Sequence, residues 1–404
     1  MTISVTGIGS ISSNCKTPNE LLDAAVSSSI VTNPIRINTV NGKIEIPVCS
    51  IDDNELTKKK FTSFRKLDRT AKLAAYAAHN AWLDSGLDKY DIDMNKVAVI
   101  IGTSRGPVGK WEETYNRQCA KIKQLPSLAA SGTIASISGS ISQLINASGP
   151  SFTISSTCSS SASAIALGAS MVESGNCDAV LVGGVESVIN ESVINVMRSA
   201  GLIGKDSIPD RTCKPFDTNR NGLVVGEGAG FLVLESLAHA NKRNFNPLVR
   251  IAGWNTGLSQ AGKVGVQLSG ESFANCIKKS LSMSDLKSTD IDYINAHGTG
   301  TKLNDLCESN AINLVDGLSN VPLSSLKPIT GHCLGASPAL EAILSIKSIT
   351  NSIAPQTTNL LEQDPKINLN LIKGKALEKS INNVLSTSLG FWGNHASIIF
   401  SKIK

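Results

Sequence analysis

One cysteine and two histidines stand in surroundings that are typical of a reactive site. Cys158 is the single thiol in the run T-C-S-S-S at 157–161, and His297 and His332 follow far downstream, each in a glycine-containing turn. Glycine lets the backbone come close to a ligand, so both imidazoles are well placed to contact one. A thiol followed by two such histidines predicts covalent acyl chemistry, with separate hydrogen-bond donors for an oxyanion or an enolate.

The segments around Cys158 predict a strand before it and a helix after it. A β-rich run covers 151–155, and a small-residue helix is expected at about 159–173. The sulfur would then lie at a helix N-terminus, where unpaired N–H groups and the positive end of the helix dipole favour a thiolate. We therefore expect a lowered pKa for Cys158, whereas the other eight cysteines are expected to be inert and mostly buried.

Short β-rich runs alternate with helical patterns along the chain, which predicts an α/β layered fold. A helix is expected at 69–83, with Asp68 as its N-cap. The pattern restarts near residue 247, so we expect an N-terminal half at 1–246 and a C-terminal half at 247–404. The first half carries the thiol and the second carries both histidines. Strands are expected at 3–7, 97–102, 179–183, 230–234, 293–296, 384–388 and 397–400.

In their order and sequence, these motifs resemble those of the β-ketoacyl-acyl-carrier-protein synthases, the condensing enzymes of fatty-acid and polyketide assembly. The resemblance begins at S-V-T-G-I-G (4–9) and extends to Gly390-Phe391, so it covers essentially the whole chain. Synthase II looks like the most similar subtype. The resemblance implies a duplicated, thiolase-like fold with five layers in the order αβαβα.

The resemblance also implies roles for individual residues. It makes Cys158 the acylated nucleophile and His297 and His332 the pair that polarises a malonyl thioester as carbon dioxide leaves. Lys327 and Glu341 match the supporting residues that orient the second histidine. Thr299 and Thr301 match hydroxyl groups that bind the phosphopantetheine arm, although either could merely cap a turn.

The family motif G-F-G-G-T-N reads G-F-W-G-N-H at 390–395 in this chain. In the family, the residue that matches Phe391 gates the acyl pocket, and its N–H completes an oxyanion hole with that of the cysteine. Trp392 replaces a glycine, which restricts the backbone of the loop. It is expected either to narrow the pocket entrance or to pack in the core, and Trp111 is expected at the pocket floor. Two further departures are Thr157, where alanine is usual, and Asn295, where glutamate is common.

Composition limits the partners that the chain can bind. A net charge of +5 over 404 residues does not by itself indicate nucleic-acid binding. The resemblance implies an acidic partner, the acyl carrier protein, which would dock on Arg65 and Lys66 with Arg198 nearby. The alternative for these residues is an ordinary solvated charged surface.

The sequence indicates no metal, bound cofactor or membrane segment. The nine cysteines form no C-x-x-C pair, and no paired Cys/His spacing supports a zinc site. The resemblance implies that phosphopantetheine arrives on the carrier protein, so no cofactor need be bound. The N-terminus lacks the features of a signal peptide, so the cytoplasm is the expected compartment. An uncharged stretch at 124–172 is rich in Ser and Gly, which favours a subunit interface over a transmembrane segment.

The leading hypothesis is therefore a decarboxylative condensing enzyme that produces 3-oxoacyl carrier protein and forms a dimer. A homodimer and a heterodimer with a chain-length-factor-like subunit both remain open. A thiolase would need a second catalytic cysteine near the C-terminus, and no cysteine follows Cys333. A non-catalytic scaffold subunit would typically lack the nucleophile, whereas Cys158 is present.

Overall fold

The strands of the N-terminal half form a mixed sheet in the order β5-β4-β6-β8-β1. β4 runs parallel to both β5 and β6, whereas β8 is antiparallel to both β6 and β1. The bounds are β1 Ile3–Ser12, β4 Val97–Gly102, β5 Ser151–Ile154, β6 Ala179–Glu186 and β8 Gly228–Ser236. This computed structural model describes residues 1–40, 42–52, 54, 64, 66–206, 208–260 and 266–403.

The C-terminal half repeats the same topology in the order β11-β10-β14-β15-β9. β10 runs parallel to both β11 and β14, and β15 is antiparallel to both β14 and β9. β1 and β9 pair over three residues each, which joins the two sets of strands into one ten-stranded sheet. The bounds are β9 Val249–Leu258, β10 Tyr293–Asn295, β11 Leu323–Ser324, β14 Asn383–Leu389 and β15 Asn394–Ser401.

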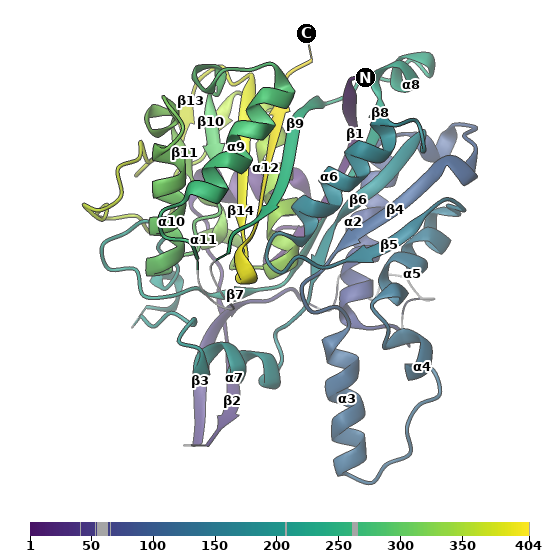
Figure 1. Ribbon diagram of the computed structural model, residues 1–404. Coiled ribbons are helices and arrows are strands. Elements are labelled where there is room, and N and C mark those ends of the chain that lie inside the picture. The colour runs from purple at the N-terminus through teal and green to yellow at the C-terminus, as the bar shows by residue number, and fades with distance from the viewer. Residues whose placement is uncertain are drawn as a thin grey trace.

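Helices cover both faces of each half, and two of them lie between the halves (Figure 1). α6 (Ser160–Glu173) packs on strands of both halves, and α12 (Ser337–Asn351) packs on β8, β14 and α6. α2 (Arg69–Asp84) and α5 (Ala135–Ile145) cover the outer face of the first half, and α9 (Glu271–Ser284) and α10 (Lys302–Asn313) that of the second. The predicted five-layer αβαβα fold is confirmed.

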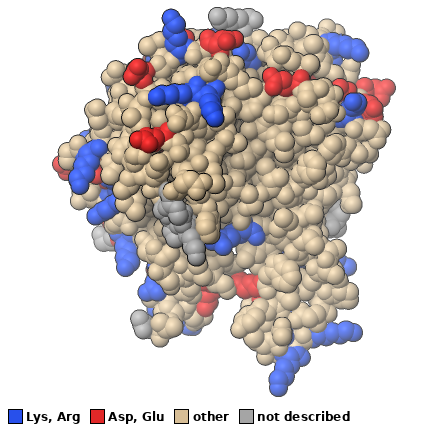
Figure 2. All heavy atoms as spheres, viewed as in Figure 1, with Lys and Arg blue, Asp and Glu red and all other residues tan. Residues whose placement is uncertain are grey.

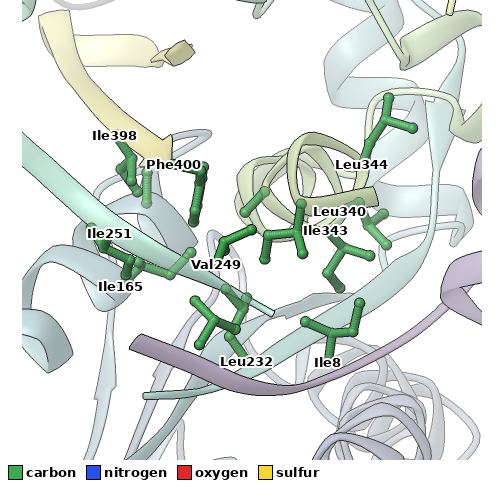
Figure 3. Packing of buried hydrophobic residues seen from close by; sticks show 14 of the residues in the cluster. Ile8, Ile165, Leu232, Val249, Ile251, Leu340, Ile343, Leu344, Ile398 and Phe400 are labelled. Carbon is green, nitrogen blue, oxygen red and sulfur yellow. The ribbon is translucent and has the colours of Figure 1, made fainter. Parts of the chain in front are cut away.

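The central layer is buried because both of its faces contact a sheet. α12 is buried on nearly every side, as expected for a helix without a solvent face. Figure 3 shows Leu340, Ile343 and Leu344 of this helix packed beside side chains from β1, β8, β9 and β15. Burial of such side chains removes apolar surface from water, at about 25 cal/mol per Å². The candidate active site is built on this buried layer, from which water is excluded.

The local predictions agree well with the structure where strands and helices are buried. The helix expected at 69–83 is α2, and the Asp68 side chain accepts a hydrogen bond of 2.8 Å from the Thr70 N–H. Glycines in β1 explain how closely this helix packs, because a Cβ on Gly7 would lie 2.2 Å from the Ala81 carbonyl oxygen. The strand expected at 97–102 is β4, and the other expected strands fall on longer or shorter strands at the same places.

A projecting part of the molecule was not predicted. The hairpin of β2 (Asn33–Thr39) and β3 (Gly42–Cys49), with α7 (Glu191–Ser199), extends below the sheets in Figure 1, as does α3 (Val108–Cys119). Asn41-Gly42 is a sequence signal for such a hairpin. The smaller elements are α1 Pro18–Ser27, α4 Leu128–Ser131, β7 Val225–Gly226, α8 Leu237–Lys242, α11 Lys327–Thr330, β12 Ile353–Ala354 and β13 Leu377–Glu378.

The boundary expected at 246/247 falls in the connection between α8 and β9. We keep this division into two halves as a proposal. In the described part of the chain, none of the helices combines the length and the apolar character that crossing a bilayer requires.

Candidate active site

A cavity of about 690 Å³ brings together segments that are far apart in the sequence. Cys158 follows β5, His297 follows β10, His332 follows α11 and Phe391 follows β14, and all four side chains line this cavity. The predicted Thr299 and Thr301 line it too, beside apolar side chains such as Leu202 and Leu334. The fold therefore delivers the thiol and both imidazoles to one chamber.

Cys158 lies in a sharp turn immediately before the N-cap residue of α6, Ser159. The preceding Thr157 has φ of +55°, a left-handed conformation that is rare for a β-branched residue. This turn presents the sulfur to the cavity while the rest of the residue is buried.

The expectation of a lowered pKa for Cys158 is wrong for the free chain. Burial raises the pKa of this thiol to about 12, although the Lys327 charge opposes the rise. Glu186 adds to the increase, and a hydrogen bond from the Phe391 backbone N–H opposes it. Burial removes water from around the sulfur and so disfavours the charged thiolate. This effect on the pKa outweighs the stabilisation expected from the helix N-terminus.

Lys327 is fully buried, and its ammonium group is shared among three acceptors. It lies 2.5 Å from Glu341 Oε1 and 3.3 Å from His297 Nδ1, and it also donates to the His297 carbonyl oxygen. An ammonium group can only donate, so Nδ1 of His297 accepts and the proton of the neutral ring lies on Nε2. Burial raises the pKa of Glu341, and the Lys327 charge opposes that rise.

The two imidazoles lie edge to face, with ring centroids 5.4 Å apart and planes at 84°. Burial is the main cause that lowers the pKa of His297 and of His332, and the Lys327 charge lowers both further. Nδ1 of His332 lies 3.2 Å from the Ser337 hydroxyl, at the start of α12. Both rings are therefore neutral near pH 7, and neutral imidazoles can donate hydrogen bonds to a developing oxyanion or enolate.

Two buried acids support the first histidine turn and were missed in the sequence. Glu308 Oε1 and Oε2 accept from the backbone N–H groups of His297 and Gly298, both at 2.8 Å. Asp305 accepts from the Thr299 N–H at 3.0 Å. The two acids are three residues apart on α10, immediately after the H-G-T-G-T motif, so helical spacing could have identified them.

Two of the departures from the family motif are involved in local contacts. The Asn295 side-chain amide donates to the Glu341 carbonyl oxygen at 2.8 Å, so it ties β10 to α12. Trp392 has φ of +62° and is 55% exposed, so the alternative that it packs in the core is wrong, and it does not line the cavity. Its predicted effect on the pocket entrance stays a prediction.

Trp111 and the predicted docking residues lie away from the cavity lining. The Trp111 side chain on α3 is 62% exposed, and its indole N–H donates to the Gly132 carbonyl oxygen at 2.9 Å. The structure does not bring it to the cavity of this single chain, and its place at the pocket floor stays a prediction. Lys66 is exposed and Arg198, on α7, is half-buried, whereas Arg65 lies outside the described residues.

The described residues contain no group of three His, Cys, Asp or Glu side chains arranged to hold a metal ion.

Titration of the two imidazoles would test this electrostatic picture. A lowered pKa means that the neutral ring persists to lower pH, so the side-chain NMR signals of His297 and His332 should not shift as pH falls through about 6.5, the ordinary value for histidine. Spectra of His297→Gln and His332→Gln assign the signals, and the unfolded chain is the control, in which all histidines should titrate normally. A midpoint near the ordinary value in the folded chain would contradict the assignment of neutral donors.

The whole chain is similar to known condensing enzymes. Residues 2–240 match the family described as "Beta-ketoacyl synthase, N-terminal domain", and residues 248–361 match its C-terminal domain. The chain is 30% identical to a 3-oxoacyl-[acyl-carrier-protein] synthase 2 of Coxiella burnetii, over 99% of this chain and 98% of that protein.

Two solved structures show the same similarity in three dimensions. A type II polyketide ketosynthase in complex with its acyl carrier protein has a TM-score of 0.89 at 25% identity, covering 100% of this chain and 99% of that chain. The ishigamide ketosynthase/chain length factor has a TM-score of 0.89 at 26% identity, with the same coverage. The chain has two matching sets of strands, a cavity lined by Cys158, His297 and His332, and family matches along most of its length. It therefore belongs to the β-ketoacyl synthase family.

Proposed function

We propose that the chain catalyses decarboxylative condensation: an acyl group held on Cys158 joins malonyl-acyl carrier protein to give 3-oxoacyl-acyl carrier protein. The observation that carries this proposal is the shared cavity, in which one thiol faces two neutral imidazoles. This arrangement provides a nucleophile for acyl transfer and separate donors for the enolate. The reaction class is an acyltransferase reaction in fatty-acid or polyketide-type synthesis.

In the first half-reaction, the Cys158 sulfur attacks the thioester carbonyl of the acyl donor. The backbone N–H groups of Cys158 and Phe391 are the proposed oxyanion donors. The tetrahedral intermediate collapses to a Cys158 thioester as its bond to the carrier sulfur breaks. The carrier arm leaves as a thiol, because its sulfur takes up the proton that the cysteine thiol gave up. Lys327, the Phe391 N–H and Arg105 favour the thiolate, against the cost of its burial.

In the second half-reaction, the malonyl thioester binds with its carbonyl oxygen between the two imidazoles. The C–C bond to the carboxylate breaks, carbon dioxide leaves, and the electron pair forms an enolate whose oxygen is stabilised by hydrogen bonds. His297 offers its Nε2–H because Lys327 occupies the other ring nitrogen. The enolate carbon then attacks the Cys158 thioester, which releases the sulfur as thiolate.

The remaining site residues are proposed to hold these groups and the substrate in place. The sequence assigned Lys327 and Glu341 to the second histidine, whereas the ammonium group of this buried ion pair contacts His297. We propose that the pair fixes the tautomer of His297. Thr299 and Thr301, whose hydroxyls lie 2.8 Å apart on the cavity wall, are assigned to the phosphopantetheine arm. That arm arrives on the carrier protein, so the proposed reaction uses no cofactor resident on this chain. We place the reaction in the cytoplasm.

The chain is proposed to act as a dimer, either with itself or with a related subunit such as a chain length factor. β5 is one of the two edge strands of the sheet and lies within the uncharged stretch at 124–172, and Phe152 on this strand is 47% exposed. The side of the molecule that holds β5 and α5 carries few charged side chains in Figure 2. An unpaired edge with apolar side chains is suited to pairing with a second subunit. Because the nucleophile is present, we assign the catalytic role to this chain in either assembly.

Cys158→Ala should abolish self-acylation and condensation, because Cys158 is the one thiol among the described residues that line the cavity. Intact-mass analysis after incubation with a panel of acyl carrier proteins measures acylation, and product analysis measures condensation. Cys119→Ala is the matched control, since Cys119 is an exposed thiol on α3 and should leave both unchanged. Condensation at the wild-type rate by Cys158→Ala would favour a scaffold role for the chain.

His297→Ala and His332→Ala should each lower malonyl decarboxylation by about 10²-fold or more, the usual scale for losing one such donor. Acyl transfer to Cys158 should fall less, because the imidazoles are assigned to the enolate. Measuring both half-reactions separately tests this division of roles. His239→Gln, outside the cavity, serves as the control. The division is wrong if decarboxylation survives both alanine substitutions.

We further propose that acyl carrier protein docks on a basic surface that includes Arg65, Lys66 and Arg198. Lys66→Glu combined with Arg198→Glu should raise KM for the carrier protein, and more so at low salt, because carrier proteins are acidic. Lys242→Glu, on α8, is the control. If the combined Lys66→Glu and Arg198→Glu changes raise KM no more than Lys242→Glu does, the docking surface lies elsewhere.

A further inference from the structure

The turn that contains Phe391 is connected to the nucleophile turn by a side chain. The Thr157 hydroxyl donates to the Phe391 carbonyl oxygen at 3.2 Å, across 234 positions of sequence. The Asn394 side-chain amide donates to the same oxygen at 3.0 Å. Thr157 and Asn394 both stand where the sequence departs from the family motif.

The two turns are in very close contact at Gly390. A Cβ on this residue would lie 2.1 Å from the Thr157 hydroxyl oxygen and 2.9 Å from the Cys158 nitrogen, so no larger residue fits without a shift. The Gly390 N–H donates to the Asn394 carbonyl oxygen at 2.7 Å, which closes the turn. Residues 390–394 are thus packed directly against the residue that precedes the nucleophile.

Both turns hold a non-glycine residue in a left-handed conformation. Thr157 has φ of +55° and Trp392 has φ of +62°. Such residues are strained and persist only where surrounding contacts fix them. The two hydrogen bonds to the Phe391 carbonyl oxygen are contacts of this kind, because that oxygen belongs to the peptide bond between Phe391 and Trp392.

We propose that Thr157 is a positioning residue whose hydroxyl holds the Phe391 turn in place, so that the Phe391 N–H stays directed at the Cys158 sulfur. The residue touches neither substrate nor reacting atom; it acts through the Phe391 carbonyl. Trp392 makes this contact necessary, because a tryptophan in the left-handed conformation does not hold the turn by itself. The inference deepens the proposed condensing function, on which it rests.

The proposal predicts a change in the ionisation of Cys158, because the Phe391 N–H favours the thiolate. The other charged or titratable groups around this sulfur are Lys327, Glu186, Arg105, His297, His332 and Lys302. None of them bonds to the Thr157 hydroxyl in the described structure. A change confined to that hydroxyl therefore reports on the Phe391 turn.

The test compares Thr157→Val, which keeps the shape and loses the hydroxyl, with Thr157→Ser, which keeps the hydroxyl. Iodoacetamide alkylation of the Cys158 peptide is followed by mass spectrometry at one mildly alkaline pH, far below the midpoint of this thiol, in the full chain without carrier protein. The alkylation rate there is proportional to the thiolate fraction, so Thr157→Val should slow alkylation about tenfold, the scale of one hydrogen bond to a charged group. Thr157→Ser should restore most of the rate. Condensation should show a lower kcat for Thr157→Val with little change in KM for carrier protein.

A wild-type alkylation rate and kcat for a folded Thr157→Val would overturn the proposal, and so would equally slow alkylation of Thr157→Ser. If Thr157→Val does not fold, Asn394→Ala removes the other donor to the same carbonyl. It should also slow alkylation, and an unchanged rate would count against the proposal. Alkylation needs no condensing activity. A wild-type chain that is alkylated normally but does not condense would therefore overturn the proposed function and leave the positioning role standing.

Discussion

The buried ammonium group of Lys327 is the interaction on which the rest of the site depends. It has no solvent around it, so its charge must be met by Glu341 and by two acceptors on His297. Removing one partner of such a pair leaves an uncompensated buried charge, which costs about 3–5 kcal/mol. The same charge fixes the tautomer of His297, keeps both imidazoles neutral and opposes the rise in the pKa of Cys158. Lys327 thus links the stability of the fold to the protonation states of Cys158, His297 and His332.

The layered fold supplies the burial that gives this charge its effect. α6 and α12 are enclosed between the two halves, and the site lies where loops from both halves meet over these helices. Burial carries a cost for the nucleophile, since it raises the pKa of the Cys158 thiol. It has a benefit for the enolate, because an enolate exposed to water would be protonated before it could form a carbon–carbon bond. Under the proposed mechanism, burial therefore assists the second half-reaction, and the first relies on the groups that oppose the rise in the Cys158 pKa.

Those local donors are where this chain differs from its family. Thr157, Trp392 and Asn394 change the two turns that meet at the nucleophile, while the reacting groups remain. Trp392, in the left-handed conformation, stands where the family has a flexible glycine. Thr157, with its hydroxyl, stands where the family has the smaller alanine. The proposed reacting groups are those of the family, whereas the contacts that hold the Phe391 turn, with its proposed oxyanion donor, differ.

The sequence by itself determined the features that depend on neighbouring residues. The α2 helix and its Asp68 cap, strand β4 and the glycine-containing histidine turns could be predicted because local patterns specify them. The candidate residues Cys158, His297 and His332 could be named from their motifs. Tertiary structure alone decided their ionisation, because desolvation of Cys158 comes from segments of both halves. It also decided the contact between Thr157 and Phe391, since a hydrogen bond between turns 234 positions apart leaves no pattern in a single sequence.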